Sequence, residues 1–380
     1  MTVLVPLPII APMFVYVGCY TTPDRAGTGE GITVYRMDDR SGAWEHIQLL
    51  TGVANPSFLA LDPTRRFLYC VHGGNDFSAI SAFAVAPHTS LLTALNTRQS
   101  GGRNPVSVDV HLSGRALVVA NYRDGTVAAL PINPDGTLGS LNNAVSQTGD
   151  PGPDPVEQAG SHPHHGPFDP AGRFVAVPDK GLDRTFIYRF DAARGTIAPH
   201  DPPFVRARSG AGPRHIAFHP DAPYAYVINE LDSTITTYGY DAERGVLDPR
   251  QVIGTLPPAS TGRSTGAEIA VAPSGRFLYA SNRGHDSIAI FAINAENGAL
   301  TAMGWEPTQG TMPRFFALDP SGQFLYAANQ GSDTIITFRV DQATGMLAAT
   351  GHVVRIGSPT CIVFAVEDGL VPPGYPDNSR

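Results

Sequence analysis

Short runs of alternating apolar and polar residues, separated by turns rich in Gly, Asp and Asn, extend along almost the whole chain. Runs of roughly four to eight such residues are typical of half-buried β-strands. In the segment from Asp286 to Met303, DSIAIFAINAENGALTAM, an alternating strand is followed by a polar turn and the start of another strand. The pattern predicts antiparallel strands joined by tight turns.

A longer unit repeats along the chain and consists of a leading Pro or Gly, a short strand, a Gly-containing turn, an aromatic strand and usually an Asn. The leading residues are 46 to 58 positions apart and are Pro56, Pro105, Pro163, Pro213, Gly266, Pro313 and Pro359. A period of about 50 residues with about four strands is typical of a β-propeller blade. We therefore predict an all-β fold, a seven-bladed β-propeller with four antiparallel strands per blade.

The first repeat, which begins near Tyr16, lacks the Pro-led inner strand, and the matching segment SPTCIVFAV lies at the far end of the chain. We expect this C-terminal strand to complete blade 1 and to close the ring, which removes open sheet edges. Residues 1–380 then form one propeller domain, with a short N-terminal tail and a Pro-rich C-terminal tail. The predicted blades span approximately residues 13–50 with 357–367, 55–96, 104–142, 162–200, 212–250, 265–303 and 312–350.

Composition excludes several classes of function. The chain has a formal net charge of −8 and no run of Lys or Arg, whereas nucleic acids and anionic membranes bind concentrated positive charge. We therefore expect neither as a partner. Three scattered Cys predict buried free thiols, and no apolar segment is long enough to span a membrane. Without a convincing signal peptide, we expect a cytoplasmic protein that is a monomer or a weak homo-oligomer.

Departures from the repeat mark candidate functional residues. The inner strand of each blade lines the centre of a propeller, and polar side chains at its mouth are the usual ligand contacts. In blades 4 to 7, but not in blades 2 and 3, titratable residues follow the leading Pro or Gly. The candidates among them are His164, Arg214, His215, Glu268 and Arg314.

The end of the second strand provides another series of equivalent positions. The Asn that recurs there, as in Asn121 and Asn282, is expected to cap the following turn, and His72 replaces it in blade 2. The next residue differs in every blade but two, and the series is Tyr20, Gly73, Tyr122, Lys180, Glu230, Arg283 and Gln330. Glu230 and Arg283 come from adjacent blades and are a candidate anion-binding and acid–base pair.

These candidates also have structural interpretations. Arginines such as Arg214 and Arg283 can tie blades together by binding carbonyl groups, and Glu230 can simply pair with one of them. The three histidines of SHPHHG have metal-like spacing, but no carboxylate or Cys is placed to complete a ligand set. We predict no metal and no cofactor, because nucleotide-binding motifs are absent from the sequence as well.

Three segments closely resemble the seven-bladed lactonase family, which includes the propeller-type 6-phosphogluconolactonases and the 3-carboxy-cis,cis-muconate cyclases. The segments are GPRHIAFHPDAPYAYVINELDSTITTY, EIAVAPSGRFLYASNRGHDSIAIF and PRFFALDPSGQFLYAANQGSDTIITF. The resemblance extends from YVGCYT at Tyr16 to the closing strand. It implies a lactone site at the channel mouth with the catalytic residues His164, Arg214, Glu230 and Arg283. The residues we expect to bind substrate are His162, His215, Glu268, Arg314, Tyr20 and His72.

We predict a lactonase that hydrolyses a small sugar-acid lactone by attack of water on the ester carbonyl. Arginines would hold the substrate and stabilise the oxyanion, and His164 or Glu230 would take the proton from water. A muconate-type lactonizing cyclase is the alternative, because it needs the same arginines to hold carboxylates. A non-catalytic protein-binding propeller is the second alternative, and it predicts an apolar mouth.

One residue departs from the family pattern and bears on the substrate. Many bacterial relatives carry Arg-Gln shortly before the histidine segment, whereas this chain reads PVEQAGSHPHH, with Glu157 in place of the arginine. If that arginine helps to hold a phosphate, its loss weakens the assignment to 6-phosphogluconolactone and leaves a sugar lactone without phosphate, or another lactone, open as the substrate.

Overall fold

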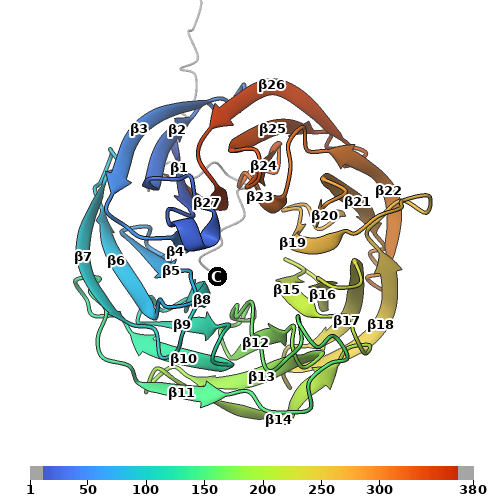
Figure 1. Cartoon of the computed structure of the whole chain (residues 1–380), viewed down its shortest axis with the longest axis horizontal. Helices are drawn as coiled ribbons and strands as arrows, with labels where there is room; N and C mark the ends of the chain where they lie inside the picture. Colours follow the sequence, from blue (N-terminus) through green and yellow to red (C-terminus); the bar gives the residue numbers. More distant parts are fainter. Residues whose placement is uncertain (1–11, 367–380) are drawn as a thin grey trace, which may run out of the picture.

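The structure of this protein is a computed structural model that describes residues 12–366. These residues form seven β-sheets arranged as blades around a common centre, which confirms the predicted propeller (Figure 1). The predicted N-terminal tail before Pro12 and the Pro-rich tail after Val366 lie outside the described residues. Within residues 12–366 the one helical element is the short 3₁₀ helix η1 (Pro23–Arg25).

From the innermost strand outward, blade 1 contains β27 (Pro359–Val366), β1 (Met13–Cys19), β2 (Gly31–Met37) and β3 (Trp44–Thr51). Blade 2 contains β4 (Pro56–Leu61), β5 (Phe67–His72), β6 (Ala79–Val85) and β7 (Leu92–Gln99). Blade 3 contains β8 (Pro105–Val110), β9 (Ala116–Asn121), β10 (Thr126–Pro131) and β11 (Asn143–Ser146). Blade 4 contains β12 (Phe174–Asp179), β13 (Arg184–Asp191) and β14 (Thr196–Arg206).

Blade 5 contains β15 (Pro213–Phe218), β16 (Tyr224–Asn229), β17 (Thr234–Asp241) and β18 (Val246–Gly254). Blade 6 contains β19 (Thr265–Val271), β20 (Phe277–Arg283), β21 (Ser287–Ile293) and β22 (Leu300–Pro307). Blade 7 contains β23 (Pro313–Leu318), β24 (Phe324–Asn329), β25 (Thr334–Val340) and β26 (Leu347–Arg355). Within each blade, consecutive strands pair antiparallel, as the alternating pattern predicts.

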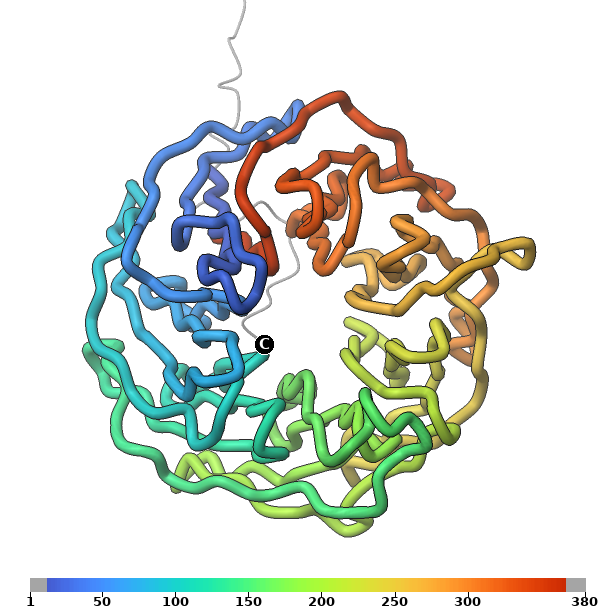
Figure 2. The backbone as a smooth tube through the Cα atoms, in the orientation of Figure 1, coloured from blue at the N-terminus to red at the C-terminus, as the bar shows by residue number. Residues whose placement is uncertain are grey.

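The two ends of the described chain meet in blade 1 and close the ring. β27 pairs antiparallel with β1, from Met13 opposite Val366 to Gly18 opposite Cys361. In Figure 2 the red C-terminal segment accordingly lies beside the blue N-terminal one. Ile362 of β27 is buried in the same apolar cluster as residues of β1 and β24. The predicted closure is therefore confirmed.

Blade 4 departs from four regular strands. Its innermost segment runs beside β12 but pairs with it only as isolated bridges, between Pro163 and Asp179 and between Phe168 and Val175. Individual backbone hydrogen bonds, such as that from His164 N–H to the Pro178 carbonyl at 3.0 Å, also join the two. Pro163 and Pro167 supply no backbone N–H for a regular ladder, which interrupts the strand. The segment from His162 to Phe168 is therefore an irregular inner edge, and it carries the predicted His164.

Two recurring side chains tie neighbouring blades together. The Tyr of the second strand donates a hydrogen bond to a turn carbonyl of the following blade, as from Tyr226 to Gly298 at 3.1 Å and from Tyr279 to Gly345 at 2.8 Å. The recurring Asn acts in the opposite direction, because Asn282 Nδ2 donates to the carbonyl of Thr255 at 2.9 Å, just after the last strand of the preceding blade. Asn121 and Asn329 join blades in the same way, whereas the sequence predicted that this Asn would cap a turn. Asn229 is the exception, because it donates to Thr234 and Thr236 of its own blade.

Two further predictions from composition can be compared with the structure. Cys19, Cys70 and Cys361 are all buried free thiols, which confirms the prediction for them. Among residues 12–366, no helix has the length and apolar character needed to cross a membrane.

We expect Ile362→Ala to lower the free energy of unfolding by about 2–5 kcal/mol, because it opens a cavity where the closing strand packs on β1. Ile362 is only 3% exposed. Val353→Ala, at a position 49% exposed on β26, is the control and should cost less than about 1 kcal/mol. Denaturant unfolding of both variants measures the difference. If both variants lost the same small amount of unfolding free energy, this would contradict the view that the packing of β27 closes the ring.

Candidate active site

Both series of candidate residues meet at one end of the blades because the first two strands are antiparallel. Pro213 at the start of β15 lies opposite Asn229 at the end of β16, and Pro313 lies opposite Asn329 in the same way. The residues that follow the leading Pro therefore lie near those that follow the Asn. We call this end of the ring the polar mouth.

A β-bulge recurs at the start of the inner strand. The register shifts between Pro213 and His215 in β15 and between Pro313 and Phe315 in β23, so the residue after each Pro is the extra one. Bulges redirect side chains and are frequent beside active sites. The residues after the leading Pro accordingly line one small enclosed space at the centre, and they are Ser57, Val106, His164, Arg214, Arg314 and Thr360.

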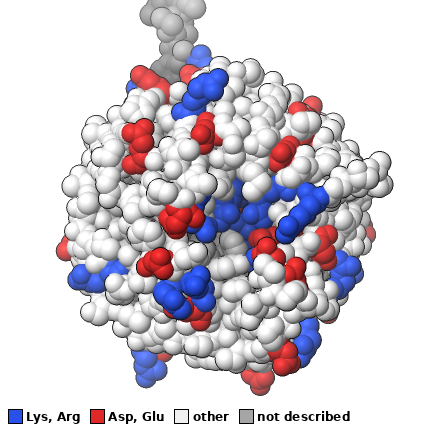
Figure 3. Space-filling view, in the orientation of Figure 1, with Lys and Arg blue, Asp and Glu red and all other residues white. Residues whose placement is uncertain are grey.

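Figure 3 shows Lys and Arg side chains gathered at the centre of this face, although the chain as a whole is acidic. Glu230 lies among them and binds three cations. Its carboxylate oxygens are 3.1 Å from Arg214 Nε, 3.2 Å from an Arg283 guanidinium nitrogen and 3.5 Å from Lys180 Nζ. Burial alone would raise the pKa of Glu230, but Arg283, Lys180 and Arg214 outweigh it and hold that pKa well below its usual range. Glu230 is therefore a permanent anion.

Arg214 and Arg283 also bind the backbone of blade 6. Arg214 donates to the carbonyl of Ala267 at 2.5 Å, and Arg283 donates to that of Gly266 at 3.1 Å. Burial, together with the charges of Arg283 and Arg314, lowers the pKa of Arg214 to about 9, so this guanidinium remains cationic at neutral pH. Both arginines thus tie blades together by binding carbonyl groups, and this structural role is compatible with a further role in binding a ligand.

Three side chains from three blades form a hydrogen-bonded chain. Nδ1 of His215 is 3.0 and 3.1 Å from the two carboxylate oxygens of Glu268, and its Nε2 is 3.2 Å from Nδ1 of His164. All three residues are buried. Burial and the nearby Arg214 lower the pKa of both His164 and His215 well below its usual value. Both imidazoles are therefore neutral at pH 7.

Tyr20 and Arg314 occupy the other side of the enclosed space. The Arg314 guanidinium lies 5.3 Å from the centre of the Tyr20 ring, and Arg25 donates to the Tyr20 hydroxyl at 2.5 Å. Burial alone would raise the pKa of Tyr20, but Arg314 and Arg25 outweigh it and lower that pKa. Within residues 12–366, Arg314 forms no ion pair with a carboxylate. This guanidinium is therefore available to a ligand anion.

Two predicted residues are engaged elsewhere. Both ring nitrogens of His72 are bound within its own blade, Nδ1 at 2.6 Å from the carbonyl of Ala54 and Nε2 at 2.7 Å from the hydroxyl of Ser81. His72 thus has no ring nitrogen left for a ligand. His162 stacks on the ring of Tyr122 at 4.4 Å, with its Nδ1 3.0 Å from the carbonyl of that residue. The stacked pair forms a wall of the mouth near His164.

The sequence prediction did not include Lys180 and Tyr122 among the site residues, and it named Glu157 only as a departure from the family pattern. Lys180 Nζ lies 2.7 Å from a Glu157 oxygen and 5.2 Å from the centre of the Tyr122 ring. Burial alone would lower the pKa of Lys180, but Glu230, Tyr122 and Glu157 outweigh it and raise that pKa. Lys180 and Tyr122 occupy the same repeat position as Glu230 and Arg283. Their repeat position could therefore have identified them as candidates from the sequence.

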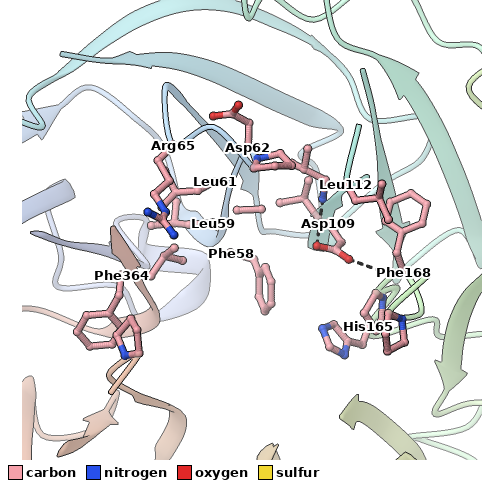
Figure 4. A pocket seen from close by; sticks show the side chains of 18 of the residues that line it. Phe58, Leu59, Leu61, Asp62, Arg65, Asp109, Leu112, His165, Phe168 and Phe364 are labelled. Atoms are coloured by element: carbon pink, nitrogen blue, oxygen red, sulfur yellow. Dashed lines mark hydrogen bonds between the residues drawn. The ribbon is translucent and has the colours of Figure 1, made fainter. Parts of the chain in front are cut away.

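Larger cavities lie at the opposite end of the inner strands. One of about 450 Å³ is shown in Figure 4, where Phe58 and His165 project toward the centre and Asp109 is bonded to Phe168. Its lining is largely apolar, and the Asp109 oxygens already accept the backbone N–H groups of Phe168 and Val110 at 2.8 and 3.0 Å. We therefore place the candidate chemistry at the polar mouth. In residues 12–366, no group of three or more His, Cys, Asp or Glu is arranged to hold a metal ion.

A propeller with buried cations, an ionised carboxylate and neutral histidines at one mouth is typical of an enzyme that acts on a small polar molecule. The family model of the lactonase, seven-bladed β-propeller, matches residues 14–364, and the chain belongs to this family. The 6-phosphogluconolactonase of Bacillus subtilis (strain 168) is 33% identical over 311 residues, which cover 80% of this chain and 84% of that protein. The 6-phosphogluconolactonase of Formosa agariphila is also 33% identical, over a region that covers 80% of this chain and 86% of that protein. Among solved structures, the periplasmic gluconolactonase of Pseudomonas aeruginosa is similar with a TM-score of 0.87 and 30% identity, over 94% of this chain and 100% of that chain.

We expect Glu230→Gln to lower the free energy of unfolding by about 3–5 kcal/mol, because it leaves three buried cations without their anion. Added sulfate should recover part of this loss in the variant and should have less effect on the native protein. Glu45→Gln is the control, because it breaks an exposed pair with Arg36 that is worth about 0–1 kcal/mol. Thermal unfolding in chloride and in sulfate at equal ionic strength checks both. An equal response of the two variants would contradict the anchoring role of Glu230.

Proposed function

We propose that this protein hydrolyses a sugar-acid lactone that carries an anionic group, with 6-phosphogluconolactone as the first candidate. The observation that carries the proposal is His164, a neutral imidazole that lines the same enclosed space as Arg214 and Arg314. Hydrolysis of a lactone needs a base to activate water and positive charge to stabilise the oxyanion. Membership of the lactonase family and the names of the relatives support the same reaction.

In the proposed mechanism, His164 takes a proton from water as the water oxygen attacks the lactone carbonyl carbon. The negative charge that develops on the carbonyl oxygen is stabilised by the cations around Glu230, which are Lys180, Arg214 and Arg283. The bond from the carbonyl carbon to the ring oxygen then breaks, and the ring oxygen receives the proton from His164. The products are the open hydroxy acid and the free enzyme.

His164 suits the role of base better than Glu230, which the sequence left as an equal candidate. Cations hold the pKa of Glu230 well below its usual range, and burial lowers the pKa of His164 as well, so the pKa alone does not separate the two groups. The Glu230 oxygens, however, are already paired with Arg214, Arg283 and Lys180. We assign Glu230 the role of holding these cations in place.

The charge balance of the polar mouth favours an anionic substrate. Four cations, Lys180, Arg214, Arg283 and Arg314, face the permanently ionised Glu230, and Glu157 pairs with Lys180 at one edge. Positive charge is therefore in excess, chiefly on the Arg314 side. Glu157 offsets charge at the edge near Lys180, but the region of Tyr20, Arg25 and Arg314 retains the donors that a phosphate or carboxylate needs. A protein-binding propeller predicts an apolar mouth, and a charged one supports a small anionic substrate instead.

We expect His164→Gln to reduce kcat for lactone hydrolysis by about 10²–10⁴-fold, because it removes the general base. His285→Gln replaces an exposed histidine and should retain native activity. The rate is followed by acid release at constant pH, with the uncatalysed rate subtracted, and a chelator should leave it unchanged. Full activity of a folded His164→Gln variant would refute this assignment. If the protein instead cyclised a carboxymuconate and opened no lactone, the muconate cyclase would be the better description.

We expect Arg314→Gln to raise KM for 6-phosphogluconolactone by about 10–100-fold, because the variant loses one charge-assisted hydrogen bond to the phosphate. KM for gluconolactone without phosphate should change by less than about threefold. Arg123→Gln is the control, because it removes an exposed positive charge beside Tyr122. It tests whether the loss of any positive charge near the polar mouth raises KM. Steady-state kinetics with both lactones measure the difference. A similar rise in KM for both would argue against an anion site at Arg314.

A further inference from the structure

The chain of hydrogen bonds from Glu268 through His215 to His164 determines which nitrogen of His164 carries its proton. We infer that Glu268 and His215 are positioning residues that keep the Nε2 atom of His164 unprotonated and able to accept a proton from water. The inference rests on the proposed function of His164 as the base. It assigns Glu268 another role than the substrate binding expected from the sequence, whereas His215 also lines the enclosed space.

The donor and acceptor roles follow from the three contacts. An ionised Glu268 is an acceptor only, so His215 must carry its proton on Nδ1, which lies 3.0 and 3.1 Å from the carboxylate oxygens. Nε2 of the neutral His215 is then an acceptor, and it takes a hydrogen bond from Nδ1–H of His164 at 3.2 Å. Nε2 of His164 is left with a free lone pair. A carboxylate thereby orients a base through an intervening imidazole, the role that a buried aspartate has toward the histidine of serine hydrolases.

Glu268 is separated from the substrate side of His164. It is absent from the residues that line the enclosed space with His164, Arg214 and Arg314, and instead borders a cavity of about 980 Å³ at the opposite end of the inner strands. Its Oε1 also accepts the backbone N–H of Ile269 at 3.0 Å. Glu268 thus reaches His164 through His215 and does not itself line the enclosed space.

The charge of Glu268 makes this arrangement dependent on pH. Burial raises the pKa of Glu268 to about 7, and it outweighs the opposing influence of His165, Arg214 and Arg314. The groups that face this carboxyl from the surrounding elements are His165, His215, Arg214, Arg314 and the Cys361 thiol. Above the pKa of Glu268 its carboxylate imposes the tautomer described above.

Below that pKa, Glu268 takes up one proton from solvent and becomes a donor to Nδ1 of His215. His215 then carries its proton on Nε2 and donates to Nδ1 of His164, whose own proton moves to Nε2. Both imidazoles remain neutral, but the lone pair needed for water activation is lost. Activity should therefore fall as pH falls through the pKa of Glu268.

The test compares the native protein, Glu268→Gln and Asp109→Asn. Asp109 is also a buried carboxyl, and burial raises its pKa to about 6, but it bonds only to backbone groups away from His164. We expect Glu268→Gln to lower kcat by about 10–100-fold with little change in KM, and to remove the fall in kcat near pH 7. Asp109→Asn should keep the native pH profile. If Glu268→Gln kept the native kcat and pH profile, the inference would be overturned.

Nitrogen-15 chemical shifts of the His164 ring provide a readout that does not depend on activity. At pH 8 the native protein should carry the ring proton on Nδ1, and Glu268→Gln should shift the population toward Nε2. A native protein with the proton on Nε2 at pH 8 would overturn the inference. If the native protein opened no lactone, the proposed function would fail, while the ring shifts would still decide whether Glu268 sets the tautomer.

Discussion

A single buried carboxylate makes the charged mouth of this propeller possible. Glu230 lies 3.1 to 3.5 Å from nitrogens of Arg214, Arg283 and Lys180, which come from three consecutive blades. Without an anion between them, these cations would repel one another in an interior where water screens charge poorly. The carboxylate therefore allows blades 4, 5 and 6 to pack around the polar mouth, where positive charge remains in excess. The same cations keep Glu230 ionised, and the proposed mechanism therefore assigns the proton transfer to the neutral His164.

The propeller supports this cluster through features that repeat in the blades. Antiparallel pairing brings the start of the inner strand and the end of the second strand to one mouth, and the bulge after a leading Pro, as in blades 5 and 7, turns an extra side chain toward the centre. Hydrogen bonds such as those from Tyr226 and Asn282 fix each blade against its neighbours. Groups from different blades are thus held at hydrogen-bond distances by the strands and by the turns that follow them.

The sequence predicted the fold, and it predicted that the candidate residues meet at one mouth, because both depend on the repeat. The period of the leading Pro and the missing inner strand of the first repeat predicted seven blades and their closure. Arg214, Arg314, Glu230 and Arg283 were recognisable because they break the pattern at equivalent positions. Repeat position does not specify rotamers or partners, so the pairing of Lys180 with Glu157 and the internal bonds of His72 could not be predicted. The irregular inner edge of blade 4 was missed because the sequence pattern of its repeat resembles the others despite the second proline, Pro167.

The central claim is that the polar mouth opens a lactone by attack of water on the carbonyl carbon. The most direct measurement is the ring opening of 6-phosphogluconolactone in oxygen-18 water, with the rate and the position of the label determined together. The account predicts saturable acceleration over the uncatalysed reaction, with one label in the new carboxylate and none in the released hydroxyl. No acceleration, or a label in the hydroxyl, would contradict it.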